Sequence, residues 1–201
     1  MNLTEAKIEN KAAQYAKSLR TQAVKNEPQI TEDLQKIALE VAAEIVGLEH
    51  KFKTEDSLTK KLAKNSQKSL QYLSAKHNLK PQAIEKTVSR LAQQNNDALR
   101  YTFLLPIETY TFDFKKTLTK LKEMNYEISD KDIWNAWKNI GTIFDKGYRG
   151  INVTIISSQG QIFELQFHTK ESFRLKMKTH KLYKTAVLPK FRLKKKKKLF
   201  G

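Results

Sequence analysis

The chain contains no cysteine among its 201 residues. This absence excludes disulfide bonds, Cys-ligated zinc, iron–sulfur clusters and catalysis by a thiolate. The four histidines are scattered and do not have the spacing of a compact metal site; they are His50, His77, His168 and His180. The chemistry of the protein must therefore be sought mainly among its carboxylates, amides, hydroxyls and basic groups.

Long apolar runs are also lacking. No stretch approaches the roughly 18 residues that a membrane helix needs, and the N-terminal sequence MNLTEAKIEN has no apolar core like that of a signal peptide. We therefore expect no membrane span and a cytoplasmic location, with export without a cleaved signal as the other possibility.

Acidic residues are scarce relative to basic ones. The chain has 38 Lys and Arg against 21 Asp and Glu, a net charge of +17. The C-terminal run KFRLKKKKK (190–198) holds seven cations and no acid, so 17 less 7 leaves +10 on residues 1–189. This excess indicates a polyanionic partner such as nucleotides or RNA. The run itself is typical of a solvated end, or of an electrostatic arm for RNA or membrane phosphates.

Glycine and proline are rare in the first 95 residues, which are rich in Ala, Leu, Lys and Gln. This composition favours helices, and apolar residues recur there at helical spacing. The expected elements are a marginal helix or flexible lead-in over 1–27, a helix over 31–48 with Thr31 as its N-cap, a helix that begins at Ser57, and a helix with Pro81 in its first turn.

Short runs rich in β-branched and aromatic residues begin near residue 99. The expected strands cover 99–105, 126–129, 133–137, 151–157 and 162–168, and the expected helices cover about 111–124 and 170–184. Strands joined by hairpins and flanked by grouped helices indicate an α+β fold with a mainly antiparallel sheet, here preceded by a helical N-terminal segment.

The hairpin around Gly160 has strands in which polar and apolar residues alternate, so its register can be predicted. A three-residue loop with Gly160 in the left-handed conformation sets Glu164 opposite Thr154. A two-residue loop would instead mix the core and solvent sides. The preferred register predicts a polar row on one sheet face, which as a pattern also fits an ordinary solvated face; the row is Asn152, Thr154, Glu164, Gln166 and His168.

Three motifs in the second half carry a resemblance to a known family. They are GYRGINV (147–153), FELQFHT (163–169) and HKLYK (180–184). In this order they resemble the synthetase domain of the RelA/SpoT family, which has a Gly-Tyr-Arg strand, a Glu-x-Gln-x-Arg-Thr strand and a closing helix with a His-x-x-Tyr-Lys motif. The resemblance spans roughly residues 45–185.

Two upstream motifs agree with this resemblance. NDALRYTFLLP (96–106) is similar to the Asp-containing entry into the family's first strand, and four residues reproduce the spacing of its ATP-phosphate element, namely Lys51, Lys53, Ser57 and Lys61. The implied organisation is a lead-in over 1–27, a synthetase domain over 28–186 and a polybasic tail over 187–201.

The family resemblance implies a transferase, a pyrophosphokinase that moves the β,γ-diphosphate of Mg²⁺-bound ATP to the 3′-hydroxyl of a guanine nucleotide in guanosine tetraphosphate metabolism. Toxin-type members instead modify the 3′ end of tRNA, and an antitoxin or immunity protein is then an expected partner. Either reaction needs cations for the triphosphate, carboxylates for the metal and the hydroxyl, and a flat group for the acceptor base.

The resemblance assigns the donor side of the site. It implies ATP-phosphate contacts for Lys51, Lys53, Ser57 and Lys61, to which Arg100 is added as a cation on a strand. Asp97 resembles the magnesium-binding aspartate. Glu164 resembles the catalytic glutamate, which also holds metal and takes the proton from the attacking hydroxyl. Each lysine taken singly also fits a surface charge, and Asp97 also fits a turn residue.

The acceptor side rests on the later motifs. Tyr148 resembles the tyrosine that stacks on the acceptor base, and its position after Gly147 predicts a loop edge with a free ring, although packing into the core is the other possibility. Further expected acceptor contacts are Arg149, Asn152, Gln166, His168 and His180. For Asn152, Gln166 and His180, a structural hydrogen-bond role is an equal interpretation.

The chain also departs from the family pattern. Arg100 follows Asp97 by three residues where the family usually has five, Asn152 stands for a histidine, and His168 stands for an arginine. These changes leave the acceptor open between a guanine nucleotide and RNA. A third hypothesis is a basic RNA-binding module without catalysis, but an acid such as Glu164 in the centre of a binding face opposes affinity for polyanions.

Overall fold

The computed structural model describes residues 3–74, 82–128, 130–141 and 147–179. Pro81, His180 and the polybasic tail lie outside the described residues, so the predictions made for them stay predictions. Among the residues described, no helix combines the length and the apolar character needed to cross a membrane.

The N-terminal residues form one long helix, α1 (Leu3–Glu40), rather than a lead-in followed by a helix over 31–48. Its buried residues Ile8, Ala12 and Ala16 recur every four positions, which is the spacing of one helix face. Small alanines let α1 pack closely against α2 (Glu55–Ser74) and α3 (Gln82–Gln93). Of the two alternatives predicted for 1–27, the helix is observed and the flexible lead-in is not. The packing of this helix was underestimated because alanine carries little apolar weight in a sequence yet permits tight helix packing.

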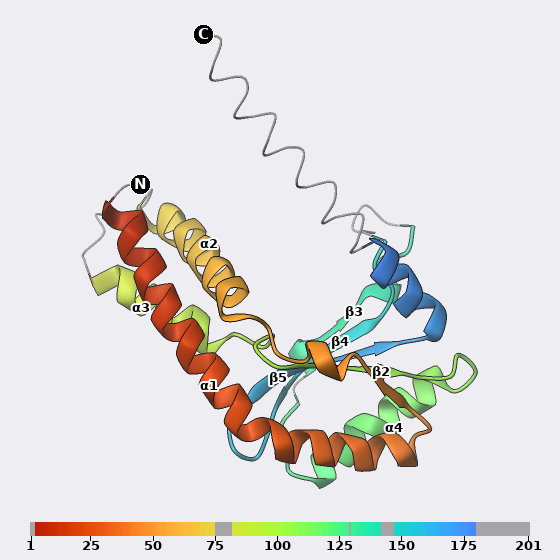
Figure 1. Cartoon of the computed structure of the whole chain (residues 1–201). Helices are drawn as coiled ribbons and strands as arrows, with labels where there is room; N and C mark the ends of the chain where they lie inside the picture. The colour runs from red at the N-terminus through yellow and green to blue at the C-terminus, as the bar shows by residue number, and fades with distance from the viewer. Residues whose placement is uncertain (1–2, 75–81, 129, 142–146, 180–201) are drawn as a thin grey trace.

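Pro28 lies inside α1, and the helix changes direction along its length (Figure 1). Proline lacks the N–H that an interior helical turn needs, so it bends a helix. The first half of α1 joins α2 and α3 in a helical layer, and the second half runs beneath the sheet (Figure 1). A predicted boundary after residue 27 therefore falls within one continuous helix.

The helix ends also differ from expectation. Thr31 is interior to α1 and is not its N-cap, because its hydroxyl contacts Glu27 and the Tyr101 hydroxyl. Ser57 lies in the first turn of α2, where its backbone N–H donates to Thr54 Oγ1 at 3.2 Å, so Thr54 supplies the capping oxygen. Residues Ile45 and Val46, expected to be helical, instead form part of a strand.

The sheet has five strands in the order β1-β2-β5-β4-β3. The strands are β1 (Glu44–Val46), β2 (Arg100–Leu104), β3 (Ile133–Asn135), β4 (Ile151–Ile156) and β5 (Ile162–His168). The pairing of β2 with β5 is parallel and the other three pairings are antiparallel. The α+β fold with a mostly antiparallel sheet is confirmed.

The predicted hairpin register is also confirmed, with Glu164 opposite Thr154 and Gln166 opposite Asn152. Gly160 has φ +77°, the left-handed conformation that the three-residue loop requires. The predicted strand over 126–129 was wrong. Glu127 makes one isolated bridge to Ile156, and the neighbouring Tyr126 is buried because its hydroxyl donates to Asp33 of α1 at 2.8 Å.

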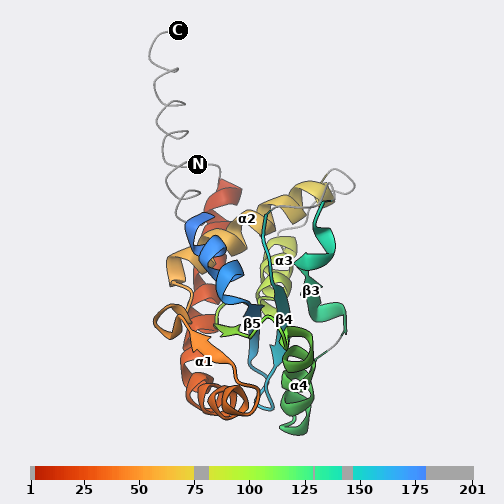
Figure 2. The same cartoon turned by 90° about the vertical axis from the view of Figure 1, so that its right-hand side faces the viewer.

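The two sheet faces have different partners. Phe163, Leu165 and Phe167 are fully buried on the face covered by α1 and α4 (Tyr110–Glu123), and Phe114 of α4 meets Phe167 edge-to-face at 5.0 Å. The expected last helix is present over the described residues 170–179 and lies on the opposite side of the sheet from α4 (Figure 2). Between this helix and α2 the polar face is partly accessible at Asn152, Thr154 and Glu164, whereas Gln166 and His168 of the same row are buried.

Ala16 tests whether the first half of α1 belongs to the core. The Ala16 side chain is fully buried, so Ala16→Glu forces an unpaired carboxylate into a packed helix interface. We expect the free energy of unfolding in urea to fall by about 3 kcal/mol or more. The exposed neighbour Lys17 supplies the control, and Lys17→Glu should change it by less than about 0.5 kcal/mol. Equal stability of the two variants would contradict this packing.

Candidate functional site

Glu164 lies in the middle of the open sheet face. Its strand β5 is central, and register places Arg100 of β2 on one side of it and Thr154 of β4 on the other. The Glu164 carboxylate oxygen Oε1 accepts from the Gln166 side-chain amide, and the Asn152 amide nitrogen lies at 3.4 Å from the same oxygen. These donors hold the carboxylate in place while it remains partly accessible.

Lys176 is a member of this cluster that sequence reasoning missed. It comes from the helix over 170–179, and its ammonium group donates to Gln166 Oε1. Burial, the largest influence, and the positive charge of Arg100 together lower the pKa of Lys176 to about 8, although the charge of Glu164 acts in the opposite direction. Lys176 lies one helical turn after Ser172, whose hydroxyl contacts His168.

A second group of contacts fixes Tyr148. Its hydroxyl donates to Asn152 Oδ1 at 2.6 Å and lies 3.0 Å from His168 Nε2. The other ring nitrogen of His168 contacts Ser172 Oγ at 3.0 Å. The imidazole packs against Gly150, where a side chain would clash because its Cβ would lie 2.8 Å from His168 Cε1. His168 is completely buried, so it acts as a structural support rather than as a group open to a ligand.

The free ring expected for Tyr148 is not observed. Trp134 of β3 stacks on it with ring centroids 5.2 Å apart and planes inclined by 23°. Burial raises the pKa of Tyr148 above its ordinary range, and the nearby carboxylate of Glu164 acts in the same direction. Arg149 next to it donates from its guanidinium to the Tyr148 carbonyl at 2.9 Å.

Asp97 forms the centre of a separate ion cluster before β2. Its Oδ2 atom lies 2.5 Å from the Lys53 ammonium and 2.9 Å from that of Lys61. Burial, the largest influence, raises the pKa of Asp97, but the hydrogen bonds and charges of the two lysines outweigh it and the pKa lies below its usual value. Oδ1 is buried and has no hydrogen-bond partner.

The Asp97 cluster and the Glu164 face are connected through the chain. Asn96, the residue before Asp97, donates from its side-chain amide to Thr154 Oγ1 at 2.7 Å, and Thr154 faces Glu164 in the register. Lys61 extends from α2, whose first turn also carries Ser57. The same first turn carries Glu55 and Asp56, whose negative charges oppose the partial positive charge of the helix N-terminus.

Lys51 does not join this cluster. Its ammonium group pairs with Glu27 of α1 at 2.6 Å. Burial, the largest influence, raises the pKa of Glu27, but its hydrogen bonds to Lys51 and Thr31 outweigh it and lower the pKa overall. The structure thus gives Lys51 a partner that ties α1 to the segment before α2. Lys53 and Lys61 are the members of the expected lysine set that meet at one carboxylate.

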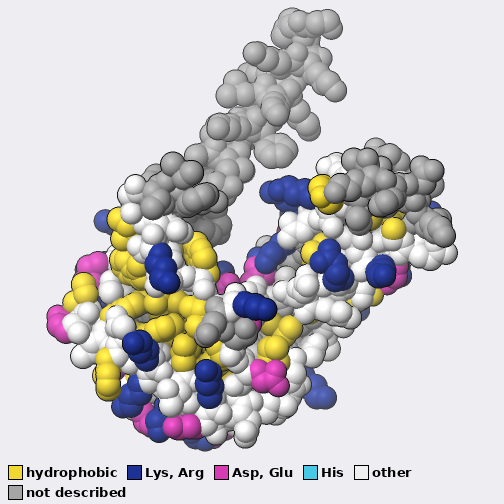
Figure 3. Space-filling view, turned by 180° about the vertical axis from the view of Figure 1, so that it is seen from behind, with side chains coloured by type: hydrophobic (Ala, Val, Ile, Leu, Met, Phe, Trp, Pro, Cys, Tyr) yellow, Lys and Arg dark blue, Asp and Glu magenta, His cyan; other side chains and the backbone are white. Residues whose placement is uncertain are grey.

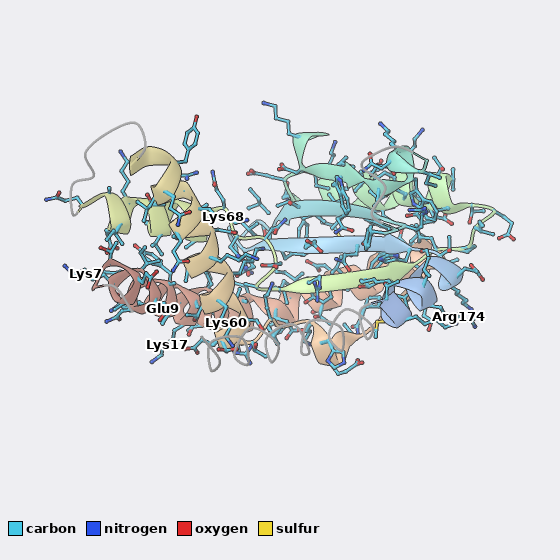
Figure 4. All side chains as sticks on the ribbon, turned by 90° about the horizontal axis from the view of Figure 1, so that it is seen from above. Lys7, Glu9, Lys17, Lys60, Lys68 and Arg174 are labelled. Carbon is cyan, nitrogen blue, oxygen red and sulfur yellow. The ribbon has the colours of Figure 1, made fainter. Side chains whose placement is uncertain are left out.

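Two views of the molecule show an open region between its helical end and its sheet end (Figure 3 and Figure 4). Seen from above, the polar sheet face extends between α2 and the helix that carries Arg174 (Figure 4). From behind, the molecule is hollowed between its helical end and its sheet end, with Lys and Arg side chains on the helical wall and acidic side chains at the bottom (Figure 3).

Within the described residues, no group of three or more His, Asp or Glu side chains could hold a metal ion alone. Mg²⁺, however, needs only one or two carboxylates when substrate phosphates and water supply its other ligands. The buried Oδ1 of Asp97 has no hydrogen-bond partner, so this oxygen has a lone pair that no donor engages.

His168 gives the site a measurable dependence on pH. Burial lowers the pKa of His168 to about 3, and the charge of Lys176 lowers it too. Between about pH 6.5 and this value the unfolded chain binds a proton that the folded chain does not, so stability falls as pH falls, by up to about 1.4 kcal/mol per pH unit. Urea unfolding from pH 7 to pH 4 should show a smaller slope for His168→Gln. Substitution of the exposed His50 is the control, and an unchanged slope in His168→Gln would contradict a buried neutral imidazole.

A scan of the chain against models of known protein families finds no match, and a search of curated protein sequences finds none either. The functional argument therefore rests on the motifs of this chain and on the contacts that its residues make.

Proposed function

We propose that the protein is an ATP-dependent pyrophosphokinase, the activity implied by its resemblance to RelA/SpoT synthetase domains. The observation that carries this proposal is the state of Asp97: one carboxylate oxygen holds Lys53 and Lys61, and the other is buried without a partner. A structural ion cluster would be expected to satisfy both oxygens, because an unpaired buried acceptor costs free energy.

The donor would bind at this cluster. Lys53 and Lys61 supply positive charge for the triphosphate, and Arg100 and Lys176 add charge on the side of Glu164. Mg²⁺ held by Asp97 and Glu164 would neutralise phosphate charge that develops during transfer. The contacts of the two lysines with Asp97 would loosen when ATP binds, because the phosphate oxygens compete with Asp97 as acceptors for the ammonium groups.

Glu164 would serve as the general base. Its carboxylate takes the proton from the 3′-hydroxyl of the acceptor as that oxygen forms a bond to the β-phosphorus of ATP. The bond between the β-phosphorus and the oxygen bridging to the α-phosphorus breaks, and AMP leaves. Asn152 and Gln166 keep the carboxylate oriented through the donors described above.

The acceptor that we favour is a guanine nucleotide, as in alarmone synthesis, in the cytoplasm where ATP is available. The 3′ end of tRNA is the second candidate, and the net charge of +17 is the observation that favours it. RNA binding without catalysis is the third, but a held carboxylate at the centre of the open face has no role in it.

Glu164→Gln tests the chemistry. The substitution removes the negative charge and keeps the shape of the side chain, so pyrophosphate transfer should fall by about 10²–10⁴-fold while ATP affinity changes little. The assay uses ATP labelled at the γ-phosphate with GDP, GTP, ADP or deacylated tRNA, and it scores both labelled acceptor and released AMP. Full activity of this variant would remove Glu164 from the mechanism, and release of ADP instead of AMP would contradict pyrophosphate transfer.

Lys61→Met tests the donor site against a neighbouring control. Lys61 contacts Asp97, whereas the adjacent Lys60 pairs with Asp56 on the exposed surface. Loss of a charged contact to phosphate is worth roughly 1.5–3 kcal/mol, so kcat/KM for ATP should fall about tenfold or more in Lys61→Met. Lys60→Met should leave it within about twofold. Equal kinetics for the two variants would mean that the phosphates bind elsewhere.

A further inference from the structure

Trp134 is an aromatic side chain left half-exposed beside the candidate site. It belongs to β3 at the edge of the sheet, and 49% of its surface is accessible. One face of its indole covers the Tyr148 ring in the stacked arrangement already described. Large aromatic side chains on a sheet surface that are neither buried nor isolated often mark a place where a flat ligand can stack.

Tyr148 is itself poorly suited to receive such a ligand. Its hydroxyl is held between Asn152 and His168, its edge meets the His168 ring at 5.3 Å, and Trp134 covers one of its faces. The tyrosine is therefore a rigid support beneath the indole. Because the indole is already held in place, stacking of a ligand on Trp134 costs less conformational entropy.

The sheet register sets the distance from Trp134 to Glu164. Trp134 pairs with Asn152 of β4, Asn152 pairs with Gln166 of β5, and Glu164 lies two residues from Gln166 on the same strand. Two strand spacings of about 4.8 Å each, combined with a two-residue offset of about 7 Å, place the backbones of Trp134 and Glu164 about 12 Å apart. A nucleoside and the Glu164 side chain together cover this span, so a base over Trp134 could carry its ribose toward the carboxylate.

We propose that the outer face of Trp134 is the surface on which the base of the acceptor stacks. This inference rests on the proposed function, because it assigns the acceptor part of the same site. The base binds through its ring face, Tyr148 supports the indole from below, and the ribose 3′-hydroxyl extends across Asn152 toward the carboxylate. The resemblance to known synthetases points to Tyr148 for this role, whereas the geometry assigns the accessible ring to Trp134.

Binding is measured first, without turnover. The chain has two tryptophans, so Trp137→Phe leaves Trp134 as the single fluorescent indole, and Glu164→Gln in the same protein prevents reaction. The ligands tested are GDP, ADP and a short RNA ending in CCA, and the control is ribose 5-phosphate, which has no base. At least one base-containing ligand should quench the fluorescence saturably, and ribose 5-phosphate should not.

Kinetics then separate stacking from structural support. Trp134→Leu should raise the KM for the acceptor about tenfold or more with the KM for ATP nearly unchanged, and Trp134→Phe, which keeps a ring, should recover most of the loss. The melting temperatures of both variants are measured alongside. An equal loss in both variants, or a fall in stability with unchanged KM for the acceptor, would overturn the assignment and leave Trp134 as a cover for Tyr148.

The outcomes also distinguish this proposal from the proposed function. Normal pyrophosphate transfer by Trp134→Leu, with no quenching by any base, would refute the stacking surface and leave the reaction standing. Saturable quenching without transfer to any acceptor by the unaltered chain would support a nucleobase site and refute the pyrophosphokinase. Quenching by ribose 5-phosphate equal to that by GDP would contradict stacking, because no ring is then required.

Discussion

Strand β5 has an apolar side and a polar side, and the rest of the structure depends on their separation. Phe163, Leu165 and Phe167 are buried against α1 and α4, so the alternate residues must lie on the opposite face. A slip of one residue would bury the Glu164 carboxylate among aromatic rings and expose the phenylalanines, at a cost of several kcal/mol. Packing of the core thus determines where the candidate general base lies.

The helical end of the molecule contributes the lysine from α2 that contacts Asp97, and α1 joins this end to the sheet. The direction change in α1 lets one helix contact α2 and α3 with its first half and the sheet with its second, so a single element fixes the two ends relative to each other. Lys61 approaches Asp97 from α2, and Lys53 approaches from the segment before it. The two lysines at Asp97 and the Glu164 carboxylate therefore come from different parts of the chain.

Sequence reasoning worked best where periodicity was strict and failed where a residue's partner lies far away in the chain. The alternation of β4 and β5 predicted the register to the residue. No local sequence pattern revealed that Lys51 pairs with Glu27 or that the Tyr126 hydroxyl donates to Asp33, because both partners lie on α1. Lys176 and Trp134 were missed for the same reason, since each gains its place by packing against residues outside its own element.

The proposed function requires that Asp97 and the two lysines around it form the phosphate and metal side of a site shared with Glu164. The most direct measurement is a crystal structure with Mg²⁺ and an ATP analogue in which a methylene group replaces the oxygen between the α- and β-phosphorus atoms, so that the bond cleaved in the reaction stays intact. The account predicts Mg²⁺ bound to the Oδ1 atom of Asp97 that now lacks a partner, with Lys53 and Lys61 on the β- and γ-phosphates. An analogue bound elsewhere, with the Asp97 ion cluster unchanged, would contradict it.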